Sequence, residues 1–254
     1  MLEPHSLLWH YLWVAPYIIL ATLALLMWRR GLHRQFPAFF VYAVFEAVSG
    51  LLLYAIDLIP SVPATTYWKS YLSFLIAEAF VKCFVVGEVF RHLLNPYPSL
   101  GKLARVLISG VGILLVFTAT IIAAFANPTP FWLISATRIL ARSINVVQCG
   151  LIVFVFIFAA YFRLRWRRDV FAITLGFAIT ACVGLSYWAL MAEWLLGQKG
   201  YLLDFLNMAT FHVCVLIWCY YILVPQKIAT TPAVLLPDHG LEVWNRELER
   251  LLQR

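Results

Sequence analysis

Long apolar runs separated by short polar turns dominate this sequence. A helix needs about 20 mostly apolar residues to cross the hydrocarbon core of a bilayer, and seven runs approach or exceed that length. They lie at about 8–28, 37–57, 70–92, 106–126, 132–161, 170–194 and 202–224. The pattern predicts an all-α polytopic membrane protein in which residues 1–225 form a bundle of seven transmembrane helices.

The turns between the runs are short and contain proline, as at 59–63 and 95–98. Short connections make sequential helices antiparallel neighbours. Within the sixth run, Gly176, Thr180 and Gly184 recur at four-residue intervals. Because small residues at this spacing let helices approach closely, we interpret them as packing positions rather than catalytic ones.

The end of the chain has a different pattern. A linker that contains threonine and proline, 226–239, precedes a segment, 240–254, in which apolar residues recur at helical spacing. This spacing predicts a short amphipathic helix on the cytoplasmic side, with an apolar stripe formed by Leu241, Trp244, Leu248, Leu251 and Leu252. Its acidic and basic residues are balanced, whereas helices that bind anionic lipid are rich in Lys and Arg. Docking on a protein partner or on the bundle therefore competes with lying on the membrane surface.

The composition agrees with a chain built for lipid. Of the 254 residues, 63% are hydrophobic and 12% are charged, whereas soluble domains carry about 25% charged residues. The net charge of +7 would suggest nucleic acid in a soluble protein. Here the basic residues gather after the first, third and fifth runs, at 29–34, 91–105 and 163–168, while the opposite loops hold only Lys69 and Lys199.

This asymmetry predicts the orientation of the chain. By the positive-inside rule, the N-terminus lies outside and the C-terminus lies in the cytoplasm. Topology and contact with anionic lipid account for the charge, so we expect the lipid bilayer, and no nucleic acid, as a partner. The short loops favour a bacterial-type plasma (inner) membrane.

Aromatic residues gather at both ends of the predicted spans. Those at the outer ends include Trp9, Trp13, Tyr67, Trp68 and Tyr71. Tryptophan and tyrosine are enriched where a membrane meets water. We therefore assign these residues to interfacial belts rather than to ligand binding.

Ionisable side chains inside the predicted spans carry the main functional signal. Charges are costly in lipid, so an intramembrane charge is by default a candidate functional residue. Glu46 lies near the middle of the second run, and Glu78 lies in the third, four residues before Lys82. That spacing, with the acid first, allows an ion pair along one helix.

The fifth run places Arg138, Arg142 and Asn145 on one helical face. Two arginines one turn apart repel each other and need acids from other helices. We therefore expect this face to point inward, with Glu46 and Glu78 as the acids available at a similar depth. Together with the lysine of the third run, the arginines would leave one excess positive charge.

Three interpretations of this set stay open. The charges form a structural ion network that fixes the helix register, or they line a cavity, open to the outer side, that binds an anionic small molecule or a lipid. Arginine suits such groups because it hydrogen-bonds them bidentately. The third interpretation is proton or ion coupling through Glu46 and Glu78. Asn207 and His212 in the seventh run are candidates for the wall of the cavity.

The sequence predicts no catalytic site, no metal site and no cofactor. All five cysteines lie within apolar runs, so free thiols are expected rather than a disulfide framework. The Cys and His residues lack metal-ligand spacing. No motif matches a family of known function.

The expected function is therefore that of a non-enzymatic sensor or receptor. It would bind a small anionic or lipid-like ligand in the outer half of the bundle and act through a separate cytoplasmic or membrane protein partner. A small transporter is one alternative, and an internal repeat relating the third and seventh runs would favour it. An accessory or assembly subunit of a larger membrane complex is another, and a membrane-embedded enzyme is the least favoured.

Overall fold

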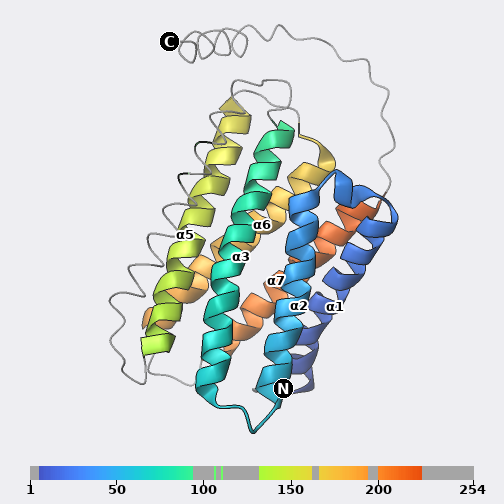
Figure 1. Ribbon diagram of the computed structural model, residues 1–254. Coiled ribbons are helices and arrows are strands. Elements are labelled where there is room, and N and C mark those ends of the chain that lie inside the picture. Colours follow the sequence, from blue (N-terminus) through green and yellow to red (C-terminus); the bar gives the residue numbers. More distant parts are fainter. Residues whose placement is uncertain are drawn as a thin grey trace, which may run out of the picture.

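The described part of the protein is built from long helices. The computed structural model describes residues 6–93, 106, 110, 132–161, 166–193 and 200–224. Its elements are α1 (Leu7–Arg29), the short 3-10 helix η1 (Leu32–Arg34), α2 (Pro37–Leu58), α3 (Ala64–Leu93), α5 (Trp132–Tyr161), α6 (Arg168–Glu193) and α7 (Gly200–Leu223). No strand occurs among these residues (Figure 1), which confirms the predicted all-α class for them.

Five of the described helices, namely α1, α2, α5, α6 and α7, are long and apolar enough to cross a membrane. The described structure therefore supports a membrane protein. The predicted run at 106–126, apart from residues 106 and 110, lies outside the described residues, as do the linker 226–239 and the segment 240–254. The seven-helix count and the amphipathic C-terminal helix with its docking stripe remain predictions.

Most helix boundaries agree with the predicted runs to within a few residues, and α5 begins and ends where it was expected. The main difference is α3, which begins at Ala64 rather than near residue 70. The backbone N–H of Thr66 donates to the carbonyl oxygen of Pro63 at 2.8 Å. Proline at a helix start is preorganised for the first turn, so α3 extends over residues too polar to appear in an apolar run.

The six long helices that the structure describes form a closed ring. Each packs on its neighbour in the order α1, α2, α3, α5, α6 and α7, and α7 returns to contact α1 (Figure 1). Across the short described connection at 59–63, α2 and α3 run antiparallel, as the short turns predicted.

An apolar core fills the ring toward the end at which α1 finishes. Its largest buried side chains include Phe39 and Tyr42 from α2, Phe177 from α6 and Trp218 from α7. Their rings lie 4.8–6.4 Å apart between centroids, at tilted or edge-to-face angles. Such pairs stabilise a core beyond the area that they bury.

Small residues allow the close approach of α6 to its neighbours. A Cβ atom at Gly176 would overlap the indole of Trp218 on α7, and one at Gly184 would lie 2.8 Å from the amide oxygen of Asn145 on α5. These contacts confirm the interpretation of the two glycines as packing positions.

A carboxylate from α3 fixes the start of α2. The Glu88 side chain is 4% exposed, and its two oxygens accept hydrogen bonds from the backbone N–H groups of Ala38 at 3.1 Å and Phe39 at 3.0 Å. First-turn N–H groups have no partner within their own helix, so Glu88 caps α2 from a neighbouring helix. From this junction Glu46 lies about 12 Å along α2 and Glu78 about 15 Å along α3, at 1.5 Å per residue. This contact between Glu88 and the start of α2, called the Glu88 clamp below, therefore sets Glu46 and Glu78 at a similar depth.

Candidate functional site

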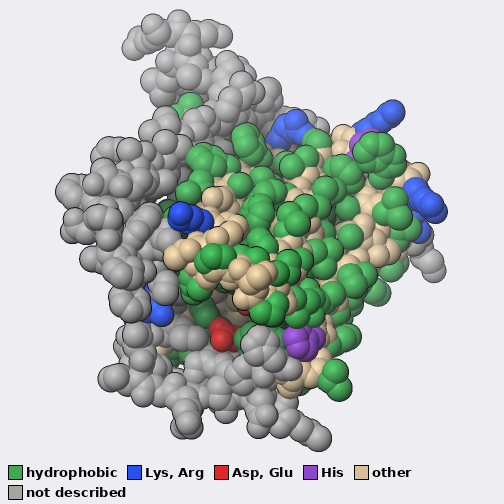
Figure 2. Space-filling model, turned by 60° about the horizontal axis from the view of Figure 1, so that its bottom comes forward, with side chains coloured by type: hydrophobic (Ala, Val, Ile, Leu, Met, Phe, Trp, Pro, Cys, Tyr) green, Lys and Arg blue, Asp and Glu red, His purple; other side chains and the backbone are tan. Residues whose placement is uncertain are grey.

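A cavity of about 570 Å³ lies inside the ring, and all six long helices contribute to its wall. It extends from the end at which α1 and α7 begin, marked by Trp9 and Asp204, to the middle of the bundle, marked by Lys82. Figure 2 looks toward this end and shows a hollow with an acidic side chain inside it. The volume falls within the range of about 300–1,000 Å³ that is typical of sites for small molecules.

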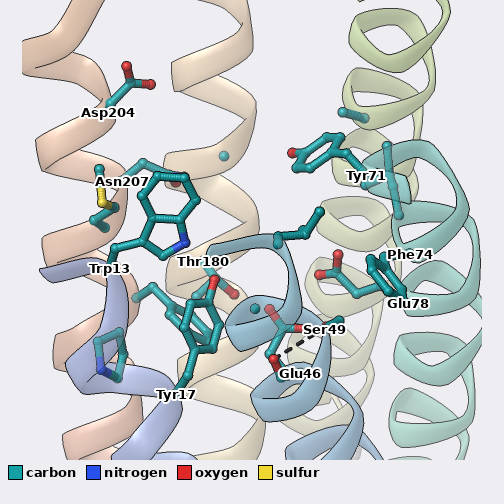
Figure 3. Close-up of a pocket in the computed structure, with 18 of the residues that line it drawn as sticks. Trp13, Tyr17, Glu46, Ser49, Tyr71, Phe74, Glu78, Thr180, Asp204 and Asn207 are labelled. Atoms are coloured by element: carbon teal, nitrogen blue, oxygen red, sulfur yellow. Dashed lines mark hydrogen bonds between the residues drawn. The ribbon is translucent and has the colours of Figure 1, made fainter. Parts of the chain in front are cut away.

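Two carboxylates lie deep in this cavity. Glu46 of α2 and Glu78 of α3 are directed toward the same space (Figure 3). The ammonium of Lys82 lies 2.5 Å from a carboxylate oxygen of Glu78, which is the intrahelical pair that the spacing predicted. Among the described residues, no donor or cation contacts the carboxylate of Glu46; the hydroxyl of Ser49 donates only to its backbone carbonyl oxygen, at 3.3 Å. Glu46 thus faces the cavity with no hydrogen-bond donor or ion-pair partner for its carboxylate among the described residues.

Two further carboxylates lie nearer the mouth. Asp57 lines the cavity close to the end of α2, and Asp204 lines it close to the start of α7. The hydroxyl of Tyr187 donates to Asp204 at 2.6 Å and so joins α6 to α7. Sequence reasoning missed both acids, because a charge near the end of an apolar run reaches water easily and gives no sign of which way it points.

The predicted inward orientation of Arg138 and Arg142 is wrong. Both side chains are exposed, neither lines the cavity, and neither pairs with Glu46 or Glu78. The buried face of α5 is instead formed by Thr137, Leu140, Ala141, Ile144 and Gln148. That face differs from the arginine face by one residue, which is about 100° around a helix. Burying two guanidinium groups is costly, and turning aliphatic residues toward α3 and α6 avoids this cost.

The remaining predicted site residues divide between the cavity and its surroundings. Asn145 lines the cavity and donates through its amide to the carbonyl oxygen of Ala141 at 2.9 Å. Asn207 also lines the cavity. His212 does not: its ring lies 5.7 Å from that of Tyr11, between α7 and α1.

Aromatic residues assigned to an interfacial belt line the cavity instead. They are Trp9, Trp13, Tyr67, Trp68 and Tyr71. Their four-residue spacing, 9 with 13 and 67 with 71, places members of each pair on one helix face, and this was the signal available in the sequence. Position along a helix alone does not distinguish a residue that faces lipid from one that faces a cavity.

Neither a metal site nor a similar known protein indicates what the cavity binds. In the part of the chain that the structure describes, no three His, Cys, Asp or Glu side chains gather closely enough to hold a metal ion. Comparison with protein-family models, with curated proteins and with solved structures finds no match to this chain. The chemistry of the cavity is therefore interpreted from its own residues.

Proposed function

We propose that this protein is a receptor or sensor of the plasma membrane that binds a small ligand in the cavity and acts on a separate protein partner. The observation that carries the proposal is a cavity of about 570 Å³ that reaches the middle of the bundle and holds the carboxylate of Glu46, which no described residue hydrogen-bonds or directly pairs. An ionisable group held inside a membrane bundle is by default a functional candidate. A purely structural network would instead close its charges on each other.

The charge distribution supports an outward-facing mouth. Arg29 is the last residue of α1, Arg30 and Arg34 follow it, and Arg91 lies near the end of α3, all at the end of the ring opposite the mouth. Positively charged loops face the cytoplasm. The mouth then opens to the outer side, where a sensor meets its ligand.

Contacts at the cytoplasmic end supply a route from the cavity to a partner. The guanidinium of Arg30 donates to the carbonyl oxygen of Leu223 at 2.7 Å, at the end of α7. The guanidinium of Arg168 lies 4.8 Å from the ring centroid of Tyr221, also on α7. Since α7 lines the cavity as well, a ligand that shifts it changes this surface. The predicted helix 240–254 follows α7 and is the expected docking element.

Labelling of cysteines from outside tests the cavity and its orientation. In a background with the five native cysteines replaced, Asn207→Cys faces the cavity, whereas Leu206→Cys is the matched control because Leu206 is 57% exposed but lies outside the cavity lining. A membrane-impermeant thiol reagent added to intact cells should label Asn207→Cys and spare Leu206→Cys. Arg34→Cys should react only after permeabilisation. If Asn207→Cys stays unlabelled in both intact and permeabilised cells, the cavity is not filled with water. If Arg34→Cys is labelled in intact cells, the proposed orientation is wrong.

One observation favours a transporter as the second candidate. Lys82 also lines a small void of about 10 Å³ between α3 and α5, together with Val86 and Gln148. The side-chain oxygen of Gln148 in this region is buried and has no hydrogen-bond partner in the described structure. The void shares Lys82 and Ile144 with the cavity, and its other lining residues on α3, such as Val86, lie further from the mouth. Labelling of Val86→Cys from the cytoplasmic side would support a transport path, whereas its protection from both sides favours a receptor.

A further inference from the structure

The charged groups of the cavity favour a positively charged ligand. The described lining contains the carboxylates of Glu46, Asp57, Glu78 and Asp204 and the ammonium of Lys82. When all are ionised, four negative charges and one positive charge leave three negative charges. Lys82 makes its direct ion pair with Glu78, and the same ammonium is the one basic group of the described lining that acts on Glu46. Arg138 and Arg142 do not line the cavity, although Arg138 lies near enough to act on the lining residue Tyr187. The described lining itself therefore has an excess of acidic groups.

The wall between these acids is largely aromatic. Trp13 and Tyr17 come from α1 and Tyr71 comes from α3 (Figure 3). Phe211 of α7 lines the cavity as well. The face of an aromatic ring attracts a cation, and aromatic cages are the usual sites for quaternary ammonium groups. The faces of these rings do not attract an anion.

One residue of the cavity wall has a backbone carbonyl without its usual helix partner. Pro16 lies within α1 and lines the cavity. Proline has no N–H, so the carbonyl oxygen of Leu12, four residues earlier, lacks its usual helix partner. Leu12 lines the cavity as well. Unwound or proline-interrupted helices at membrane depth commonly turn such carbonyl dipoles toward cations.

The size of the cavity and the spacing of its acids favour an organic cation over a metal ion. Calcium takes 6–8 oxygen ligands at roughly 2.3–2.6 Å, whereas the described carboxylates do not form a group of three that could hold a metal. A volume of about 570 Å³ with aromatic walls suits an ion that carries an apolar body.

We propose that the ligand is a small organic cation, an ammonium group with an apolar body, whose nitrogen lies next to Glu46 and whose body contacts the aromatic wall. This inference rests on the proposed function, because it names the ligand class of the same cavity. Glu46 supplies the opposing charge, and Asp57 and Asp204 attract the cation at the mouth.

Three probes of one shape test the inference on the full-length protein in lipid nanodiscs. They are choline, its neutral carbon isostere 3,3-dimethylbutan-1-ol, and the anion 3,3-dimethylbutanoate. Each is titrated against the labelling rate of Asn207→Cys. Choline should protect at a concentration about tenfold or more below that of the neutral isostere, since a partly desolvated cation–π contact with a nearby carboxylate contributes about 1.4 kcal/mol or more. The anion should not protect.

Glu46→Gln should abolish this preference, and Asp169→Asn is the matched control. Asp169 pairs with Arg167 at 2.8 Å at the opposite end of the ring, so its neutralisation should leave the preference unchanged. If Glu46→Gln does not fold, Asp57→Asn replaces it and should weaken protection by choline.

Each outcome separates the inference from the function on which it rests. Stronger protection by the anion, equal protection by choline and its neutral isostere, or no protection by any probe would overturn the cationic ligand while Asn207→Cys remains reactive. An unreactive Asn207→Cys would instead overturn the proposed function itself.

Discussion

Replacing Glu88 tests whether the Glu88 clamp fixes the start of α2 and so sets the relative depth of Glu46 and Glu78. Its carboxylate accepts from two N–H groups in the first turn of α2. Glu88→Ala leaves both donors without that partner. Phe39 is fully buried and Ala38 is half-buried, so water cannot readily replace the carboxylate at Phe39.

The expected loss of stability follows from these contacts. An unsatisfied buried donor costs about 1–3 kcal/mol, and a half-buried one costs less. A carboxylate at a helix N-terminus also gains about 0.3–1 kcal/mol from the helix dipole. Glu88→Ala should therefore lower the free energy of unfolding by about 2–4 kcal/mol. Glu88→Gln should cost about half as much, because one oxygen still accepts while the charge is lost.

The assay is equilibrium unfolding in mixed micelles of mild detergent and SDS, followed by tryptophan fluorescence. Arg91→Ala is the control, because Arg91 lies 3.9 Å from Glu88 and is 67% exposed. An exposed ion pair of this kind contributes about 0.5 kcal/mol or less after solvent screening. If Glu88→Ala unfolds like the wild type, or if Arg91→Ala costs as much, the carboxylate does not cap α2. The depth of Glu46 relative to Glu78 would then need another explanation.

Two further predictions concern helix packing. Gly176→Ala should lower the free energy of unfolding by about 1–3 kcal/mol, the usual cost of overpacking a core, because its Cβ atom would overlap Trp218. Gly150→Ala is the control and should be tolerated, because a Cβ atom there meets nothing within 4 Å. Comparable unfolding midpoints for the two variants would contradict the packing of α6 on α7. Mild oxidation should join Cys149 to Cys182, because their sulfur atoms lie 4.0 Å apart across the contact between α5 and α6. Peptide mapping that finds both thiols unreacted, or Cys214 joined instead, would contradict this contact.

The sequence predicted the helical class and most helix boundaries because both depend on local properties. A long apolar run forms a helix in lipid, where every backbone polar group needs a partner within the chain. The pair between Glu78 and Lys82 was predictable for the same reason, since four-residue spacing on one helix fixes their proximity. The depth of Glu46 followed from its place within a run.

The rotation of each helix was not predictable in this way. Arg138 and Arg142 share a face with Asn145, and the sequence alone allowed that face to point inward. A rotation of about 100° separates it from the face that packs, and α3 and α6 determine which one is buried. Trp13 and Tyr71 show the same limit, because a belt residue and a cavity residue can lie at one depth.

The sequence by itself determined that this chain forms apolar helices, and it placed their charges along the helix axes, because hydropathy and spacing are properties of each segment. Only the tertiary structure decided that Asp57 and Asp204 join Glu46 and Glu78 around one cavity while the arginines lie outside it. The sign of the cavity's charge depends on which face each helix turns inward. That choice is made by packing among six helices together, and no single segment contains it.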